Sequence, residues 1–337
     1  MNLYGKHLIC TQDWSLEELD AALELAMRMK KHRYSERYAD VLRYRTFFMF
    51  FYNPSVRTRQ SFEAAATELG GHAQFLEPKS MRLKTATTAG ETVEDAARVM
   101  SRYAAGIGIR MLEDKVTRYG EGDELLREYA KWATVPIVSM AHDRFHPCQG
   151  LADMMGIKEH LGENVKRKKI LITWGHGALA RSLCSVQEAM LISSRYGMDV
   201  TVAHPEGYDL DPEVMDWTKK NCEENGAKFE LTHDAHAGYD GAHVVYSRNW
   251  MSPKAYRDGV LQKQEEIDKA LKLTDWICDG ERMAKTENAL FTHPMPIDRG
   301  REVTDEVASG PRSIIYDVAE NRLHVQKAVM ALTMGQL

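Results

Sequence analysis

The sequence lacks any apolar run long enough to cross a membrane. No stretch approaches the roughly 20 consecutive apolar residues that a membrane-spanning helix needs. The first residues, MNLYGKHLICTQDW, show no charged segment followed by an apolar one, which is the layout of a secretory signal. We therefore expect a cytoplasmic protein without membrane association.

Paired cysteines and excess positive charge are also missing. The five cysteines are widely scattered, and no two have the spacing of metal ligands, so they are typical of reduced thiols. A net charge of -5 leaves no basic excess for a general nucleic-acid binder. The 44% hydrophobic and 28% charged content is that of an ordinary soluble globular protein. With 337 residues, the chain is long enough for two domains.

A short aromatic run leads into a basic helix start near residue 50. Phe47–Tyr52 is apolar and aromatic throughout, which favours a strand buried on both faces of a parallel sheet. Ser55 is a good N-cap for the helix that follows, and its first turn has unpaired N–H donors. That turn also carries Arg57, Thr58 and Arg59. Two arginines there oppose the helix dipole unless an anion binds, so the stretch predicts a phosphate site; the alternative is a helix start that is merely basic.

Strand-like and helix-like segments alternate through the remaining sequence. In the first half we expect helices after Ser15, at 91–103 and at 125–132, and strands at 72–76, 106–110 and 136–140. In the second half we expect strands at 170–173, 199–203, 228–232, 243–246 and 290–292, with helices at 212–225 and 317–333. This alternation predicts an α/β fold of two doubly wound domains, each with a central parallel sheet flanked by helices.

Three further segments hold polar groups at predicted strand or helix ends. Arg110 ends a strand, where ligands gather in open α/β sheets. His146 and Gln149 are three residues apart at a helix start, so their side chains face the same way. The third segment is the strand end HPMPIDRGR at 293–301. Each segment alone also has a structural explanation. Arg110 could form a surface ion pair, His146 could cap its helix, and 293–301 could be a simple turn.

These motifs resemble the signature set of the aspartate/ornithine carbamoyltransferase superfamily. The motifs are SVRTR at 55–59, HPCQ at 146–149 and HPMP at 293–296, and segments 90–103 and 320–329 are similar too. The resemblance is nearest to the N-acyl-ornithine branch and its uncharacterised or ureido-acid relatives. That likeness lies in TQDWS (11–15), TW (173–174), YGMDVTVAHPEGYDL (196–210) and VVYSRNW (244–250).

The resemblance implies substrates, site residues and an assembly. Carbamoyl phosphate would be bound by Ser55, Val56, Arg57, Thr58, Arg110, His146, Gln149, His293, Pro294 and Arg322. The catalytic candidates among them are Arg57, Thr58, Arg110, His146 and Gln149. Main-chain carbonyls around His293 and Pro294 would orient the carbamoyl amide. The family also implies a homotrimer with shared active sites, and neither a cofactor nor a metal.

Carbamoyl transfer fits these residue types. A neutral amine attacks a carbonyl while phosphate leaves, so negative charge grows on the carbonyl oxygen and on the phosphate. Arg110, His146 and the Thr58 hydroxyl are suited to the first charge, and Arg57 with the helix start is suited to the second.

The acceptor should be an amine that also bears a carboxylate. Its candidate contacts are Lys84, Trp250, Met295, Arg299 and Arg301, the last two as an arginine fork for a carboxylate. The HCLP motif of the ornithine enzymes and their SMG-type loop are replaced here by HPMP and by WMSP at 250–253. Glu302 lies about where the acyl-ornithine branch has a lysine. We therefore predict ureidoglycine as acceptor, with allantoate as product; the alternatives are N-acyl-ornithine, ornithine and aspartate.

The resemblance also implies a domain division. A carbamoyl-phosphate domain would cover 1–145, be joined by the helix at 146–160, and be completed by the helix at 317–337; an acceptor domain would cover 161–316. Segment 173–199 is similar to the knotted segment of the acyl-ornithine branch, so a knot in the second domain is consistent with the likeness.

Two competing interpretations come from other functional classes. GHGALA at 175–180 follows a strand and has the GxGxxA outline of a dinucleotide loop, but no acidic residue ends the next strand. A non-catalytic ligand-binding relative is the other alternative, although it would have no need for Arg57, Arg110 and His146 together.

Overall fold

The computed structural model describes residues 2–78 and 90–335, and the chain divides into two compact units. Unit 1 comprises Met1–Leu151 with Asn321–Leu337, and unit 2 comprises Ala152–Glu320. The chain passes between the units within α5 (Pro147–Leu161) and α11 (Ile315–Met334). Unit 1 is therefore built from two separate stretches of sequence. Which substrate each unit binds stays a prediction.

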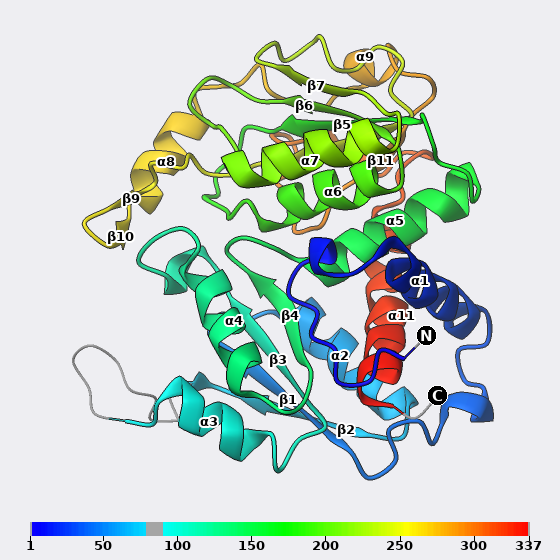
Figure 1. Ribbon diagram of the computed structural model, residues 1–337. Coiled ribbons are helices and arrows are strands. Elements are labelled where there is room, and N and C mark those ends of the chain that lie inside the picture. Colours follow the sequence, from blue (N-terminus) through cyan, green and yellow to red (C-terminus); the bar gives the residue numbers. More distant parts are fainter. Residues whose placement is uncertain (1, 79–89, 336–337) are drawn as a thin grey trace. The chain divides into compact units, whose positions relative to one another are not determined.

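Unit 1 contains a parallel sheet with the strand order β2–β1–β3–β4 among the described residues (Figure 1). The strands are β1 (Thr46–Phe51), β2 (His72–Leu76), β3 (Gly106–Met111) and β4 (Ile137–His142). The helices are α1 (Leu16–Lys31), α2 (Val56–Glu68), α3 (Val93–Met100) and α4 (Glu121–Trp132). Short 3-10 turns lie at Thr11–Asp13, Glu36–Tyr38 and Glu113–Lys115.

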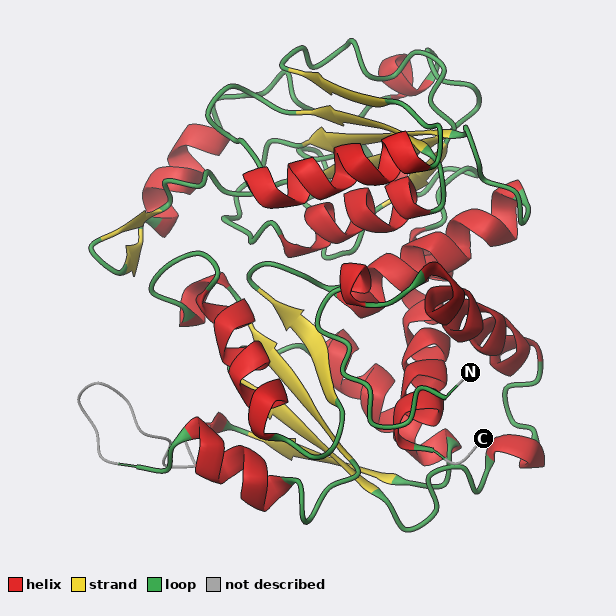
Figure 2. Cartoon of the chain, viewed as in Figure 1, coloured by secondary structure: helices red, strands yellow, loops and turns green. Residues whose placement is uncertain are grey.

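Strand β1 has apolar residues on both faces because helices cover the sheet on both sides (Figures 1 and 2). Phe48 and Phe50 belong to a core cluster with residues of α3 and α4. Phe47 faces the other way and stacks on Phe62 of α2, with ring centroids 5.5 Å apart. The continuous apolar run is thus the mark of a doubly covered parallel strand, as predicted.

The predicted helix starts are confirmed at α1 and α2. Ser15 and Glu18 form a capping box, in which each side chain accepts a hydrogen bond from the other residue's backbone N–H. The Ser55 hydroxyl accepts from the backbone N–H of Thr58 at 3.4 Å. Lys84 and the rest of its loop lie outside the described residues.

Unit 2 contains a second parallel sheet, with the order β11–β8–β5–β6–β7 in the described chain. Its strands are β5 (Lys169–Trp174), β6 (Asp199–Ala203), β7 (Phe229–Thr232), β8 (Val244–Arg248) and β11 (Leu290–Thr292). Its helices are α6 (Cys184–Arg195), α7 (Pro212–Glu224), α8 (Lys263–Ala270), α9 (Gly280–Met283) and α10 (Asp305–Ala308). A small antiparallel hairpin pairs β9 (Tyr256–Arg257) with β10 (Val260–Leu261).

The predicted fold class is confirmed, since both units are parallel sheets flanked by helices. The knot in the second unit stays a prediction.

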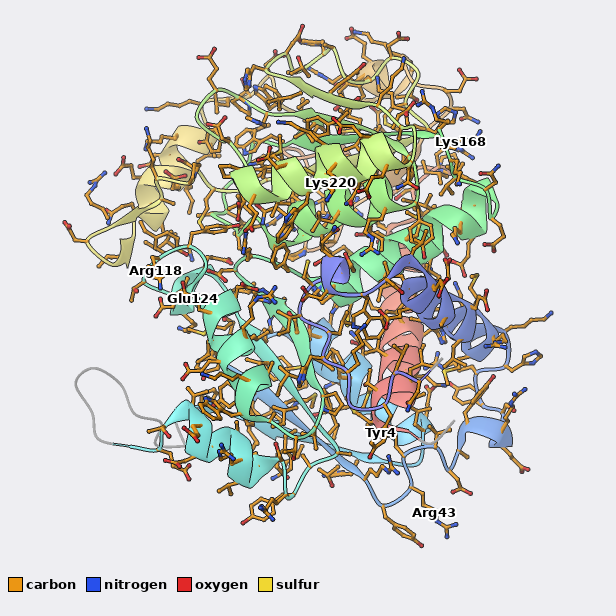
Figure 3. The ribbon with its side chains drawn as sticks, in the orientation of Figure 1. Tyr4, Arg43, Arg118, Glu124, Lys168 and Lys220 are labelled. Atoms are coloured by element: carbon orange, nitrogen blue, oxygen red, sulfur yellow. The ribbon has the colours of Figure 1, made fainter. Side chains whose placement is uncertain are left out.

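Charged side chains such as Lys168 and Lys220 lie on the surface of unit 2, and Arg118 pairs with Glu124 at the start of α4 (Figure 3). No helix in residues 2–78 or 90–335 is long and apolar enough to cross a membrane.

The dinucleotide-loop interpretation of residues 175–180 is wrong. After β5 ends at Trp174, the chain forms a loop, and α6 begins only at Cys184. The loop instead contacts its neighbours in unit 2: Ala178 N–H donates to Asp298 Oδ2 at 2.7 Å, and the Gly175 carbonyl accepts from Asn249 Nδ2 at 3.1 Å. A helix N-terminus is therefore missing where a pyrophosphate would need one.

Candidate active site

The turn from β1 into α2 is held by an asparagine. Asn53 is buried; its Oδ1 accepts from the backbone N–H of Leu112 at 2.7 Å, and its Nδ2 donates to Asp114. Leu112 directly follows β3, so these bonds tie the start of α2 to the carboxyl end of the neighbouring strand. Asn53 therefore fixes the predicted phosphate turn, a role that no local sequence pattern reveals.

The two arginines of this helix start have different surroundings. Arg57 is exposed in the first turn of α2. Arg59 donates from Nε to Glu63 Oε1 at 2.8 Å, and its guanidinium lies 4.2 Å from the centroid of the Phe75 ring. The structure therefore engages Arg59 with its own helix and with β2, while Arg57 is the exposed arginine of the first helical turn, where an anion is favoured. Val56 beside it is 79% exposed.

Three predicted residues from distant parts of the sequence meet in unit 1. Arg322 on α11 donates from Nη1 to Gln149 Oε1 at 2.9 Å and from Nη2 to Thr58 Oγ1 at 3.4 Å. All three side chains are at least nine-tenths buried. One guanidinium thus joins helices α2, α5 and α11 and brings three of the predicted site residues together.

Arg110 and His146 lie at the ends of neighbouring strands in unit 1. Arg110 pairs with Phe51 in the β1–β3 register, and its carbonyl accepts from Tyr52 N–H at 3.0 Å. Its Nη1 lies 3.5 Å from the Met140 carbonyl of β4. His146 follows β4, and its carbonyl accepts from Gln149 N–H at 2.9 Å at the start of α5. Arg110 therefore lies at the same sheet edge as the β1–α2 turn, where ligands bind in open α/β sheets.

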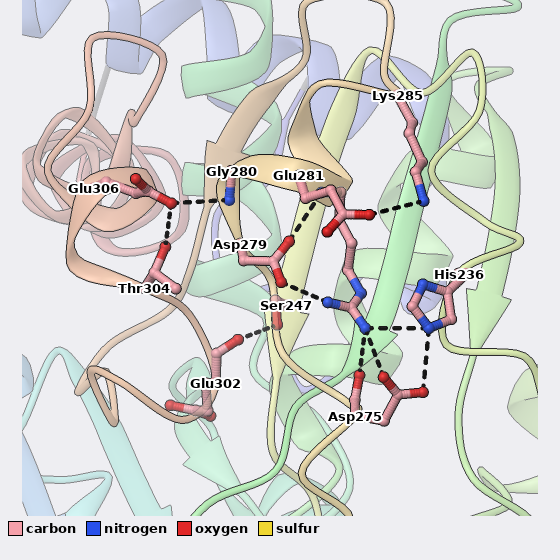
Figure 4. Close-up of polar contacts among 11 residues, drawn as sticks. His236, Ser247, Asp275, Asp279, Gly280, Glu281, Lys285, Glu302, Thr304 and Glu306 are labelled. Carbon is pink, nitrogen blue, oxygen red and sulfur yellow. Dashed lines mark hydrogen bonds and ion pairs between the residues drawn. The ribbon is translucent and has the colours of Figure 1, made fainter.

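In unit 2, His293 belongs to a fully buried polar network around Glu302. One Glu302 oxygen accepts from Arg181 Nη1 and from Asn249 N–H, both at 2.7 Å. The other accepts from Asp298 N–H at 2.7 Å and lies 3.3 Å from His293 Nε2. The Glu302 carbonyl accepts from Ser247 Oγ at 2.9 Å (Figure 4). One carboxylate thus joins β8, the 175–183 loop and the 293–301 turn.

The hydrogen bonds fix the tautomer of His293. Met295 N–H donates to Nδ1 at 2.8 Å, so Nδ1 is unprotonated and the single proton of the neutral ring is on Nε2, facing Glu302. Burial lowers the pKa of His293 to about 4, more than Glu302 raises it. Burial alone would raise the pKa of Glu302, but His293 and Arg181 outweigh it and hold that pKa well below its ordinary value. At neutral pH, a neutral imidazole therefore lies beside a carboxylate.

We expect the depressed pKa of His293 to make the folded protein less stable in acid. Because the folded pKa is depressed, the unfolded state alone takes up a proton as pH falls from about 6.5 to about 4. We expect the free energy of unfolding to fall by about 3 kcal/mol across that window. Urea unfolding at several pH values checks this. His293→Gln should flatten the slope while the same change at exposed His72 should not; an unchanged slope in His293→Gln would contradict the assignment.

Sequence reasoning missed Arg248, the last residue of β8. Its side chain is buried, and its Nε and Nη1 have no hydrogen-bond partner in the part of the chain that the structure describes. A buried guanidinium nitrogen without an acceptor is costly, and a carboxylate oxygen would satisfy it with a charge-assisted hydrogen bond. The SRNW sequence gave only a family likeness, because the burial of Arg248 depends on tertiary packing.

The predicted acceptor contacts have other partners in unit 2. Trp250 is fully buried, and its Nε1 donates to the Tyr208 carbonyl at 2.9 Å. Arg299 pairs with Asp305, and Arg301 pairs with Asp298. Met295 is partly exposed beside a cis peptide bond to Pro296. The roles of these residues stay predictions, but Arg248 is better placed to receive a carboxylate than either paired arginine.

Among residues 2–78 and 90–335, no group of three or more His, Cys, Asp or Glu side chains could hold a metal ion. The five cysteines are buried and lie outside any disulfide.

The protein belongs to the class of two-domain α/β proteins, because each unit is built on a parallel sheet with flanking helices. In the first unit, the start of α2 is suited to binding an oxyanion. Comparison with known families identifies the family within this class. Residues 6–159 match the carbamoyl-P binding domain of aspartate/ornithine carbamoyltransferases, and residues 177–333 match their Asp/Orn binding domain. The chain belongs to this family and is a carbamoyltransferase, which confirms the enzyme class predicted from the motifs.

Named relatives cover nearly the full length of the chain. An anabolic ornithine carbamoyltransferase of Pyrococcus furiosus is 38% identical over 99% of this chain and 98% of that protein. An N-acetylornithine carbamoyltransferase of Xanthomonas campestris pv. campestris is 36% identical over 98% of both. A crystal structure of acetylornithine transcarbamylase complexed with acetylcitrulline aligns with a TM-score of 0.89 at 35% identity, covering 98% of this chain and 100% of that one.

Proposed function

We propose that this carbamoyltransferase transfers the carbamoyl group of carbamoyl phosphate to the side-chain amine of an N-acylated ornithine. Relatives named for N-acetylornithine and solved structures of acetylornithine transcarbamylase support this acceptor. The ureidoglycine acceptor predicted from the sequence finds no support among these relatives. N-acyl-ornithine, which was the alternative, fits better and replaces it.

Carbamoyl phosphate is proposed to bind to unit 1. Its phosphate would lie at the start of α2 against Ser55, Arg57 and Thr58, where N–H donors and the helix dipole favour an anion. Arg110 and His146 would polarise the carbamoyl oxygen. The attacking nitrogen forms the new C–N bond, the C–O bond to phosphate breaks, and a departing phosphate oxygen takes the proton of the amine.

The observation that carries the acceptor proposal is the charge pattern around Arg248. Its buried, unsatisfied Nε and Nη1 suit the α-carboxylate of an amino acid. Two carboxylates of unit 2 are already engaged: Glu302 by Arg181 and by two backbone N–H groups, and Asp298 by Ala178 N–H and Arg301. A free α-ammonium would need such a carboxylate, whereas an acylated α-nitrogen carries no charge to neutralise.

Ornithine itself is the second candidate. The 38% identity to the Pyrococcus furiosus ornithine carbamoyltransferase favours it. In that case, a group other than the Asp298 and Glu302 carboxylates would have to neutralise the α-ammonium group of ornithine.

Phosphate release from carbamoyl phosphate tests the proposal. We expect turnover with N-acetyl- or N-succinyl-ornithine to exceed that with ornithine, aspartate or ureidoglycine by more than about 10²-fold in kcat/KM, the size of effect expected when a charged group lacks its partner. Faster turnover with ornithine would overturn the acyl preference.

Arg248 provides the matched test of the carboxylate site. Arg248→Gln should raise KM for the acceptor by about tenfold or more, because it removes a charge-assisted hydrogen bond to the carboxylate. Arg299→Gln changes the same residue type where the guanidinium is already paired with Asp305, so its KM should stay within about twofold. Equal effects of the two changes would contradict the role of Arg248.

A further inference from the structure

Strand β4 contains a bulge opposite Arg110. Ile109 pairs with Ser139 but Arg110 pairs with Ala141, which leaves Met140 as the extra residue. The Met140 carbonyl lies 3.5 Å from Arg110 Nη1, at the long limit of a hydrogen bond. Bulges of this kind redirect groups beside active sites. Here the bulge points a backbone carbonyl at a proposed catalytic guanidinium.

The bulge has a conformational cost that other residues must offset. Ala141 has a φ of 140°, in a region that L-residues rarely adopt. On the neighbouring strand, Gly108 makes room for the Met140 side chain, since a Cβ on Gly108 would lie 2.8 Å from Met140 Sδ. Because Ala141 is strained and Gly108 leaves space for Met140, we infer that the surrounding structure holds the bulge in place.

His142 makes the contacts that close the bulge. Its Nδ1 lies 2.8 Å from the Ser139 hydroxyl, on the other side of the bulged residues, and its Nε2 lies 3.2 Å from Asp123 Oδ1 on α4. An ionised carboxylate only accepts, so Nε2 donates to Asp123. Burial alone would raise the pKa of Asp123, but His142 and Arg127 hold it at about 2, so the carboxylate is charged. Ser139, His142 and Asp123 are all buried, and we call them the His142 staple.

We propose that His142 is a positioning residue for carbamoyl transfer: the His142 staple holds the bulge so that the Met140 carbonyl orients the Arg110 guanidinium. This inference rests on the proposed role of Arg110. A buried serine–histidine–aspartate chain with no exposed hydroxyl has no access to substrate, so the staple acts through the strand rather than as a nucleophile.

A double-mutant cycle separates positioning from simple stability. His142→Asn should lower kcat about tenfold or more with KM for carbamoyl phosphate within about threefold, because orientation rather than binding is lost. In the Arg110→Lys background, the same change should lower kcat by less than about twofold, since the group it orients has been altered. Equal kcat losses in both backgrounds, or an unchanged kcat in the single variant, would overturn the proposal.

The matched control is a histidine of the N-terminal segment that contacts the same strand. His7 Nδ1 accepts from Ile137 N–H at 2.9 Å, at the opposite end of β4 from the bulge. His7→Asn should leave kcat within about twofold while lowering thermal stability comparably. If His7→Asn lowers kcat as much as His142→Asn does, the effect is general loosening of β4 and the proposal fails.

Substitutions at Asp123 give a second measurement. Asp123→Asn keeps an oxygen acceptor for His142 Nε2 and should retain most of kcat, whereas Asp123→Ala should reproduce the loss seen in His142→Asn. Identical kcat values for Asp123→Asn and Asp123→Ala would contradict the proposed role of the His142 staple. If Arg110→Lys alone leaves kcat unchanged, it is the proposed role of Arg110 that fails, and the two failures are thereby distinguishable.

Discussion

Replacing Arg57 with Ala is expected to lower kcat/KM for carbamoyl phosphate by about 10²–10³-fold, or about 3–4 kcal/mol of transition-state stabilisation. The reason is the charge that develops on the departing phosphate. Arg57 is the exposed arginine of the first turn of α2, where the helix dipole already favours an anion. Initial rates of phosphate release at varied carbamoyl phosphate measure the effect.

Arg59 is the control for Arg57, since it has the same residue type and lies two positions further along the same helix. Its guanidinium already pairs with Glu63 and lies over Phe75. Arg59→Ala should change kcat/KM by less than about threefold and the free energy of unfolding by about 1 kcal/mol or less. If both variants lose activity equally, the anion site is not at Arg57 alone; if neither does, the phosphate does not bind at this helix start.

Replacing Glu302 with Ala should destabilise the protein by about 3–5 kcal/mol, because it leaves buried cationic and N–H donors without their acceptor. The carboxylate is fully buried, and it receives hydrogen bonds from Arg181, Asn249 and Asp298. Glu302→Gln keeps one oxygen acceptor and should cost less. Urea unfolding followed by tryptophan fluorescence suits this test, since Trp174 and Trp250 are buried in unit 2.

Glu306 provides the control for Glu302. It lies four residues further on, is exposed, and accepts from Gly280 N–H at 3.1 Å (Figure 4). Glu306→Ala should cost about 1 kcal/mol or less, because water satisfies the groups it leaves. A loss below about 1 kcal/mol in Glu302→Ala would show that the network adds little net stability and that its donors find other partners.

Most of the fold could be predicted from apolar patterning. The strands His72–Leu76, Asp199–Ala203 and Leu290–Thr292 were predicted to the residue. A buried strand such as Leu290–Thr292 is a short apolar run between turn residues, and that signal is local. The hairpin β9–β10 was missed because its strands are two residues long and carry no alternation.

The candidate site was only partly predictable. Motifs placed Ser55, Arg57 and Thr58 correctly at a helix start, since capping is decided within a few residues. The engagement of Arg59 by Phe75, and the unsatisfied burial of Arg248, depend on contacts that no local pattern reveals. From the sequence, Glu302 was noted only because the acyl-ornithine branch has a lysine at about this position. Its anchoring role needed Arg181, 121 residues away in the chain.

Unit 1 takes its last helix from residues that follow the whole of unit 2. Arg322 reaches back to Thr58, and buried Lys327 donates to Glu68 Oε2 at 2.8 Å, so the early segment meets its partners only after residues 321–335 exist. During synthesis, the phosphate turn therefore lacks its contacts with α11 until the roughly 170 residues of unit 2 have been translated. We therefore expect activity only after residues 321–335 have been added, and a nascent chain that ends within unit 2 should lack it.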